Sequence, residues 1–181
     1  MAKLVSKTYG DALFAVAKEE DRIDEFFDAA KGVAKFLRSD SEFGKLMNHP
    51  KIVKEEKEKI IEETFSKKIP KEMIGMLILL MKKGHADEIL SVFDYFIAVV
   101  KEEKRIGEAT VTTAVVLDEK QKAKIEKRLL ETTKYETFEM DYKTDETLIG
   151  GMTIRIGDRV VDSSIKTKLY ELSRNLRNVQ I

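Results

Sequence analysis

The chain has 181 residues, enough for one large or two small domains, and its hydrophobic content of 43% is ordinary for a folded protein. Basic and acidic residues both total 33, so net charge favours neither nucleic acid nor an anionic membrane as a partner. The absence of cysteine excludes disulfides and thiolate metal sites, and the longest apolar run, Met76 to Met81, is far shorter than the ~20 residues that span a bilayer. We therefore expect no direct membrane insertion.

Helical periodicity runs from Lys3 to about Arg105. The second predicted helix shows it most clearly, because its apolar residues recur at spacings of three and four. These residues are Ile23, Phe26, Phe27, Ala30, Val33, Ala34 and Leu37. Breaks near residues 39–41, 48–50 and 82–84, and a proline at position 70 that fits a first helical turn, divide the segment into short helices. The sequence predicts a compact bundle of five or six helices.

The first and fifth helices of this bundle are more apolar than one buried face requires. The first carries Val5, Tyr9, Ala12, Leu13, Phe14, Val16 and Ala17, and the fifth is almost continuously apolar from Met73 to Met81. Such a helix either lies at the centre of a core or exposes a second face that a partner covers. Both interpretations stay open, and three methionines in the fifth helix favour a groove for a partner helix.

Strand signals begin after Ile106-Gly107, where we place the boundary between a domain at residues 1–105 and a domain at residues 106–181. Residues 109–117 are rich in Val and Thr and predict a strand, and residues 137–142 predict a second. Asp118 with Gln121 three residues later indicates a capping box, which begins a helix between the strands.

The segment from Thr147 to Ser164 predicts a β-hairpin. Met152, Ile154 and Ile156 alternate with polar residues, Gly157-Asp158 forms the turn, and Val160-Val161 resumes the strand. Asp162, Ser163 and Ser164 can begin a helix. Its apolar stripe, Ile165, Leu169, Leu172 and Leu176, is expected to pack back onto the hairpin. The second domain is thus predicted to be small and α+β, with its helices on one face of the sheet, and the whole chain to be α+β.

We find no arrangement of residues that indicates catalysis, a metal or a cofactor. His49 and His85 lack ligands at a recognised spacing. Gly150, Gly151 and Gly157 match no phosphate-binding motif, and a bend or a close approach of backbone explains them. Asp158 and Asp162 fit turn and cap roles.

The last helix carries Lys166, Lys168, Arg174 and Arg177, which raises an alternative function as a free-standing adaptor that binds nucleic acid. The helix dipole already accounts for cations near the C-terminal end. A single aromatic residue, Tyr170, lies among these cations, so the signal for single-strand binding is weak.

Two motifs resemble the δ subunit of bacterial F-type ATP synthase, whose mitochondrial relative is the oligomycin-sensitivity-conferring protein. One is Tyr9-x-x-Ala12-Leu13 in the first helix. The other is the specific block Leu148-Ile149-Gly150-Gly151-x-x-Ile154-x-Ile156-Gly157-Asp158-x-Val160-x-Asp162-x-Ser164, followed by Leu169, Leu172 and Leu176. The resemblance covers essentially all 181 residues. Gly10 departs from it, since the family commonly has Ala there, and an interior helical Gly costs about 1 kcal/mol relative to Ala.

The resemblance implies a non-catalytic stator subunit without cofactors, monomeric in isolation and present in one copy per complex. In the family the helical domain binds the N-terminal helix of an α subunit between its first and fifth helices, and the second domain contacts the C-terminal end of the b-subunit stalk. Carried to this sequence, the α-subunit site comprises Tyr9, Ala12, Leu13, Val16, Met76, Leu79 and Leu80. The implied location is the cytoplasmic face of the bacterial cell membrane, where the complex holds the subunit peripherally. Gly150, Gly151, Gly157, Asp158, Asp162 and Ser164 then form a structural motif.

Overall fold

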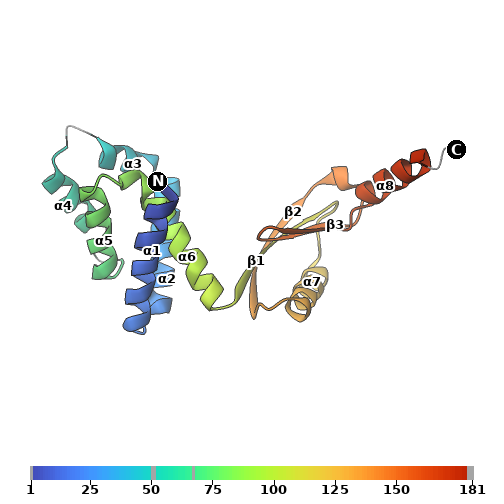
Figure 1. The fold of residues 1–181 in the computed structure, drawn as a ribbon, viewed down its shortest axis with the longest axis horizontal. Helices are drawn as coiled ribbons and strands as arrows, with labels where there is room; N and C mark the ends of the chain where they lie inside the picture. The colour runs from blue at the N-terminus through green and yellow to red at the C-terminus, as the bar shows by residue number, and fades with distance from the viewer. Residues whose placement is uncertain (1, 50–51, 67, 179–181) are drawn as a thin grey trace. The chain divides into compact units, whose positions relative to one another are not determined.

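The chain divides into two compact units, Met1–Lys101 and Glu102–Ile181, in a computed structural model that describes residues 2–49, 52–66 and 68–178. The first unit is helical and the second combines a sheet with helices, as the sequence predicts (Figure 1). The helices of the first unit are α1 (Ala2–Glu19), α2 (Ile23–Ser39), α3 (Ser41–Asn48), α4 (Lys54–Phe65), α5 (Lys71–Lys82) and α6 (Ile89–Glu103), with a 3₁₀ turn η1 (Ala86–Glu88) before α6.

Local chemistry sets the ends of these helices close to the predicted breaks. Asp40 caps α3 because its carboxylate accepts hydrogen bonds from the backbone N–H of Glu42 at 2.9 Å and of Phe43 at 3.2 Å. Pro70 lies at the N-cap of α5, one residue before the first turn in which we expected it. Gly84, with φ of 77°, follows the end of α5.

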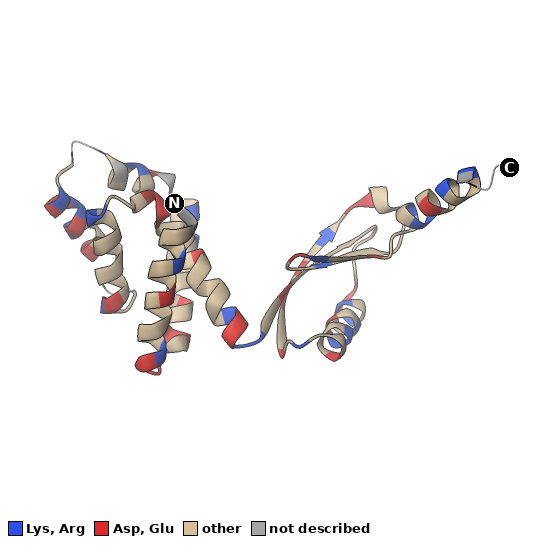
Figure 2. Ribbon diagram, in the orientation of Figure 1, with Lys and Arg blue, Asp and Glu red and all other residues tan. Residues whose placement is uncertain are grey.

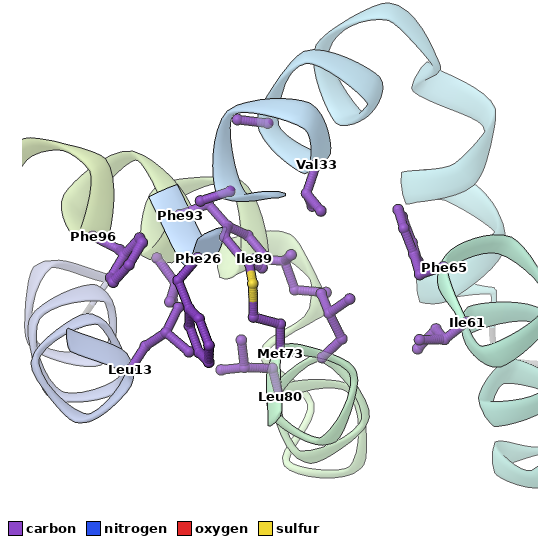
Figure 3. Packing of buried hydrophobic residues seen from close by; sticks show 14 of the residues in the cluster. Leu13, Phe26, Val33, Ile61, Phe65, Met73, Leu80, Ile89, Phe93 and Phe96 are labelled. Carbon is purple, nitrogen blue, oxygen red and sulfur yellow. The ribbon is translucent and has the colours of Figure 1, made fainter. Parts of the chain in front are cut away.

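The core of the first unit lies where the predicted stripes of several helices meet. Leu13 of α1, Phe26 of α2, Met73 and Leu80 of α5, and Phe93 and Phe96 of α6 are all nearly inaccessible to solvent (Figure 3). Beside them, Phe36, Phe43 and Phe65 meet edge to face with ring centroids 5.5 to 5.7 Å apart, the geometry that aromatic quadrupoles favour.

Gly10 has a packing role that the sequence did not reveal. It is buried in α1, and a Cβ atom there would lie only 2.4 Å from Cδ1 of Tyr95 in α6. The hydroxyl of Tyr95 donates a hydrogen bond to the Asp11 carboxylate at 2.9 Å, which holds the ring against the helix. The glycine therefore leaves room for the Tyr95 ring of α6 against α1.

We expect Gly10→Ala to lower the stability of the chain. The gain in helix propensity is about 1 kcal/mol, whereas forcing a methyl group into a filled space costs about 1–3 kcal/mol. Gly32→Ala in α2 is the matched control, because nothing lies within 4 Å of the added Cβ, and it should stabilise the chain. Urea unfolding followed by circular dichroism measures both changes, and an equal gain from the two substitutions would contradict the packing role.

The second unit is a four-stranded sheet with strand order β2-β1-β3-β4. Its elements are β1 (Ile106–Thr113), α7 (Glu119–Thr132), β2 (Thr137–Thr144), a 3₁₀ turn η2 (Glu146–Leu148), β3 (Met152–Ile156), β4 (Arg159–Asp162) and α8 (Ile165–Asn178). β1 and β2 are parallel and α7 connects them, while β3 pairs antiparallel with both β1 and β4.

The boundaries of the predicted strands required one correction. We expected the first strand to run from Ala109 to Leu117, but β1 begins at Ile106 and ends at Thr113. The pairing of β1 ends there, since Thr113 pairs with Thr144, the last residue of β2, and with Met152, the first residue of β3. The predicted capping box is confirmed: Gln121 N–H donates to Asp118 at 2.7 Å, and Asp118 N–H donates to the Gln121 side chain at 3.0 Å.

The predicted packing of the last helix onto the hairpin is wrong. The stripe of α8 is exposed, with relative exposures of 42% at Ile165, 52% at Leu169, 59% at Leu172 and 71% at Leu176. Ala109 of β1 and Phe138 of β2 pack against Leu129 of α7 instead, so α7 covers this part of the apolar face of the sheet. The stripe indicated that α8 is amphipathic, but it could not identify what covers it.

Candidate partner-binding surfaces

The described part of the chain offers surfaces for partners and no evident reaction centre. Among the described residues no group of three or more His, Asp or Glu side chains is placed to hold a metal ion. No helix within the described ranges has both the length and the apolarity that crossing a membrane requires. His85 begins η1 without a side-chain capping bond, and its Nδ1 lies 3.8 Å from a Glu88 carboxylate oxygen.

The predicted α-subunit site falls on α1 and α5, which lie beside each other. Leu13 and Leu80 point toward one another between the two helices (Figure 3), with exposures of 3% and 0%. These two leucines are buried in the core of the first unit, so the other five predicted residues are the ones available at its surface. The sequence could not separate them from their neighbours because α1 is apolar over more than half of its circumference and α5 over almost all of it.

The remaining five predicted residues reach the surface of the first unit. Ala12 and Leu79 are exposed, Leu79 at 43%, and the other three are half-buried against the core. We call this set the α1–α5 surface: Tyr9, Ala12, Val16, Met76 and Leu79. This mainly apolar set, with Leu79 exposed, is the candidate surface for a partner helix.

Hydrogen bonds fix the base of α8. The Asp162 carboxylate accepts from Ser164 N–H at 2.8 Å and from the Thr167 hydroxyl at 2.8 Å, and Ser164 Oγ accepts from Thr167 N–H at 3.2 Å. Ser164 is fully buried. The bond from Ser164 N–H, followed by that from the Thr167 hydroxyl, lowers the pKa of Asp162 below its ordinary value. The predicted cap role of Asp162 and Ser164 is confirmed.

Gly150 and Gly151 hold the same junction through their backbone. Ile165 N–H donates to the Gly150 carbonyl at 2.9 Å, so the first turn of α8 is bonded to this loop. Gly151 has φ of 77°, and a Cβ there would lie 2.4 Å from the Ser163 carbonyl oxygen. The close approach of backbone that the sequence predicts is confirmed at this position. Gly157, with φ of 56°, and the exposed Asp158 form the hairpin turn.

The lowered pKa of Asp162 predicts a loosening of the α8 base in acid. A carboxyl group with a lower pKa in the folded than in the unfolded chain stabilises the fold above its unfolded value of about 3.9, and that contribution disappears as the pH falls through the folded pKa. We expect the protection of the Ser164 and Thr167 amides, measured against their intrinsic exchange rates, to fall below about pH 3.9. Amide exchange by NMR measures this protection. Asp162→Asn should remove the loss of protection in acid, and an unchanged loss in that variant would contradict the assignment.

A second apolar surface of this unit, which the sequence analysis missed, lies beside α7. It is a groove of about 360 Å³ between α7 and β3. Its apolar lining is Leu117, Ile125, Leu129, Met152 and Ile154. The sequence predicts that Met152 and Ile154 share an apolar strand face. Since a sheet of several strands is wider than one helix, part of that face could have been expected to remain uncovered.

A family model, related sequences and a solved structure all point to the same kind of protein. A family model described as ATP synthase delta (OSCP) subunit matches residues 5–176. The ATP synthase subunit delta of Lachnoclostridium phytofermentans is 50% identical over 100% of both chains, and that of Natranaerobius thermophilus is 33% identical over 98% of both. Among solved structures, a chain in a cryo-EM structure of the Toxoplasma gondii mitochondrial ATP synthase hexamer has a TM-score of 0.75 at 20% identity, with 94% of this chain and 96% of that chain covered. This last likeness concerns the fold alone.

Proposed function

This chain belongs to the ATP synthase delta (OSCP) subunit family, and we propose from that premise that it acts as a stator linking the catalytic head of F-type ATP synthase to its peripheral stalk. The subunit is non-catalytic, and its work is to resist the torque of the rotor during proton-driven ATP synthesis. The observation that carries the proposal is that each unit exposes an apolar surface of its own.

The head contact is assigned to the α1–α5 surface of the first unit. Its occupant is the amphipathic N-terminal helix of an α subunit, whose apolar side replaces water over Leu79 and Met76. The buried Leu13 and Leu80 support the surface from beneath, so the site rests on a packed core. The partner thus meets a surface already in place.

The stalk contact is assigned to the second unit and includes α8. Its leucine stripe is exposed, and its base is fixed by the Asp162–Ser164 cap and by the bond from Ile165 to Gly150. A helix held at one end and apolar along one side can add itself to the C-terminal helices of the b subunits. The Gly150-Gly151 block, which identifies the family in the sequence, therefore shapes the stalk-binding unit.

Two modest contacts in one chain suffice for a stator because the second forms at a high effective concentration once the first has formed. α6 ends at Glu103 and β1 begins at Ile106, so a short connection joins the two binding units. One copy per complex is enough for this arrangement. We also propose that the complex holds the subunit peripherally at the cytoplasmic face of the membrane. Family membership displaces the alternative of a nucleic-acid adaptor.

Titration of the full chain with a peptide copying the α-subunit N-terminus tests the head contact. We expect NMR shifts at Tyr9, Met76 and Leu79, and no shifts on the strands of the second unit. Binding without shifts on α1 and α5 would remove the site assignment.

A further inference from the structure

The apolar face of the sheet in the second unit is wider than the single helix that covers it. Strands lie about 4.8 Å apart, so the outer two of four are separated by about 14 Å, whereas a helix with its side chains is about 10 Å across. α7 packs on Ala109 and Phe138, on the β1 and β2 side. The groove between α7 and β3 is the part of the apolar face left beside it. Val161 of β4, which pairs with Ile154 and is 59% exposed, extends this face to the sheet edge.

The rim of the groove carries two cations, Lys124 and Arg128, of which Arg128 is ion-paired with Glu131 at 3.4 Å. Lys124 and Arg128 of α7 are exposed along it, together with the neutral Gln121, and none of the residues lining the groove is acidic. Figure 2 shows blue bands of Lys and Arg along α7. Lys124 and Arg128 are four residues apart and therefore lie on the same side of the helix, next to the apolar Ile125 and Leu129.

The helix α8 of the same chain does not suit this groove. Its base is held by the Ser164 cap and by the Ile165 bond to Gly150, which fix the direction in which the helix leaves the sheet. It also carries four cations, Lys166, Lys168, Arg174 and Arg177, against one carboxylate, Glu171. Its approach to a cationic rim, in this copy or from a second copy, is therefore opposed by like charge.

We propose that the groove between α7 and β3 receives an amphipathic helix of a stalk partner, with apolar side chains over Ile125 and Ile154 and acidic side chains opposite Lys124 and Arg128. This inference rests on the proposed stator function, and it names the surface and the charge of the partner. The apolar stripe supplies affinity, whereas the acidic flank sets orientation and excludes cationic helices.

Three designed helical peptides test the charge requirement on the full chain. They share one apolar stripe and a single Trp and carry Glu, Gln or Lys on the flanks. The chain itself has no Trp, so peptide fluorescence reports binding directly. At low salt we expect the Glu peptide to bind about tenfold more tightly than the Lys peptide, and this preference to shrink in high salt. Equal binding of the three peptides would overturn the proposal.

Paired variants locate the contact. Lys124→Glu with Arg128→Glu should reverse the peptide order, whereas Lys120→Glu with Lys127→Glu, an equal charge change outside the groove lining, should leave it unchanged. Ile154→Ser should weaken all three peptides. The proposal is overturned if the Lys124→Glu and Arg128→Glu variant ranks the three peptides as the wild-type chain does. It is also overturned if Leu172→Ser on α8 weakens peptide binding and Ile154→Ser does not. The proposal would also be overturned if the chain bound anionic vesicles through Lys124 and Arg128 and did not bind the Glu peptide.

Purified peripheral stalk separates this inference from the function on which it rests. If the wild-type chain binds stalk and the Lys124→Glu and Arg128→Glu variant binds it equally well, the groove assignment fails and the stator proposal stands. If the wild-type chain does not bind stalk at all, the stator proposal itself fails. We expect wild-type binding that weakens about tenfold in the variant.

Discussion

Leu79→Asp is expected to abolish tight binding of the α-subunit helix while the first unit stays folded. Leu79 is 43% exposed, so a charge there remains hydrated in the free subunit and becomes buried against an apolar face only in the complex. Loss of a central interface contact costs at least about 2 kcal/mol, which is roughly a 30-fold rise in Kd. Calorimetry with the α-subunit peptide measures the effect, and circular dichroism confirms the fold.

Two further substitutions show whether the loss belongs to the surface. Ala123→Asp adds the same charge at an exposed position of α7 in the second unit and should leave binding intact. Leu80→Asp adds it to a fully buried neighbour and should unfold the unit, because an unpaired charge in the core is strongly unfavourable. Equal binding by the wild-type and Leu79→Asp chains would show that the helix docks elsewhere.

Gly151→Ala is expected to destabilise the second unit by about 2–4 kcal/mol, because a left-handed residue and a collision with backbone are both unfavourable. Gly151 has φ of 77°, and the added Cβ would lie 2.4 Å from the Ser163 carbonyl oxygen. That carbonyl precedes Ser164, so relief of the collision displaces the base of α8. The less stable variant should bind the stalk more weakly, whereas its first unit should bind the α-subunit peptide as tightly as the wild-type chain does.

Gly157→Ala is the matched control for this change. Gly157 also has positive φ, at 56°, but nothing lies within 4 Å of an added Cβ. Both variants therefore carry backbone strain, and only Gly151→Ala carries the collision. Chemical unfolding of the two variants should separate them by about 1–3 kcal/mol. A Gly151→Ala chain as stable as Gly157→Ala would show that the junction yields easily.

The sequence predicted most accurately the caps and turns that are formed by residues close to one another in the chain. The capping box of Asp118 and Gln121, the hairpin turn at Gly157 and the cap at Ser164 are each formed by residues within a few positions of one another. Their chemistry is complete in the local sequence, so spacing and side-chain type are enough to identify them.

Features that depend on distant contacts were less accessible. The clash that explains Gly10 comes from Tyr95 in another helix, and the pairing of β1 ends at Thr113 beside the last residue of β2 and the first residue of β3. An apolar stripe shows that a face is covered by something, and it leaves the covering element unnamed. For that reason we expected α8 to pack on the hairpin, whereas the family resemblance placed Leu13 and Leu80 at the α-subunit site although both are buried in the core of their own unit.

Reconstitution of the catalytic head with the membrane-bound stalk, with and without this chain, tests the stator function most directly. Proton pumping per ATP hydrolysed is the quantity to measure. We predict that pumping is coupled to hydrolysis with the wild-type chain, and that hydrolysis continues without pumping when the chain is omitted or carries Leu79→Asp. Full coupling in the absence of the chain would contradict its role as the link between head and stalk.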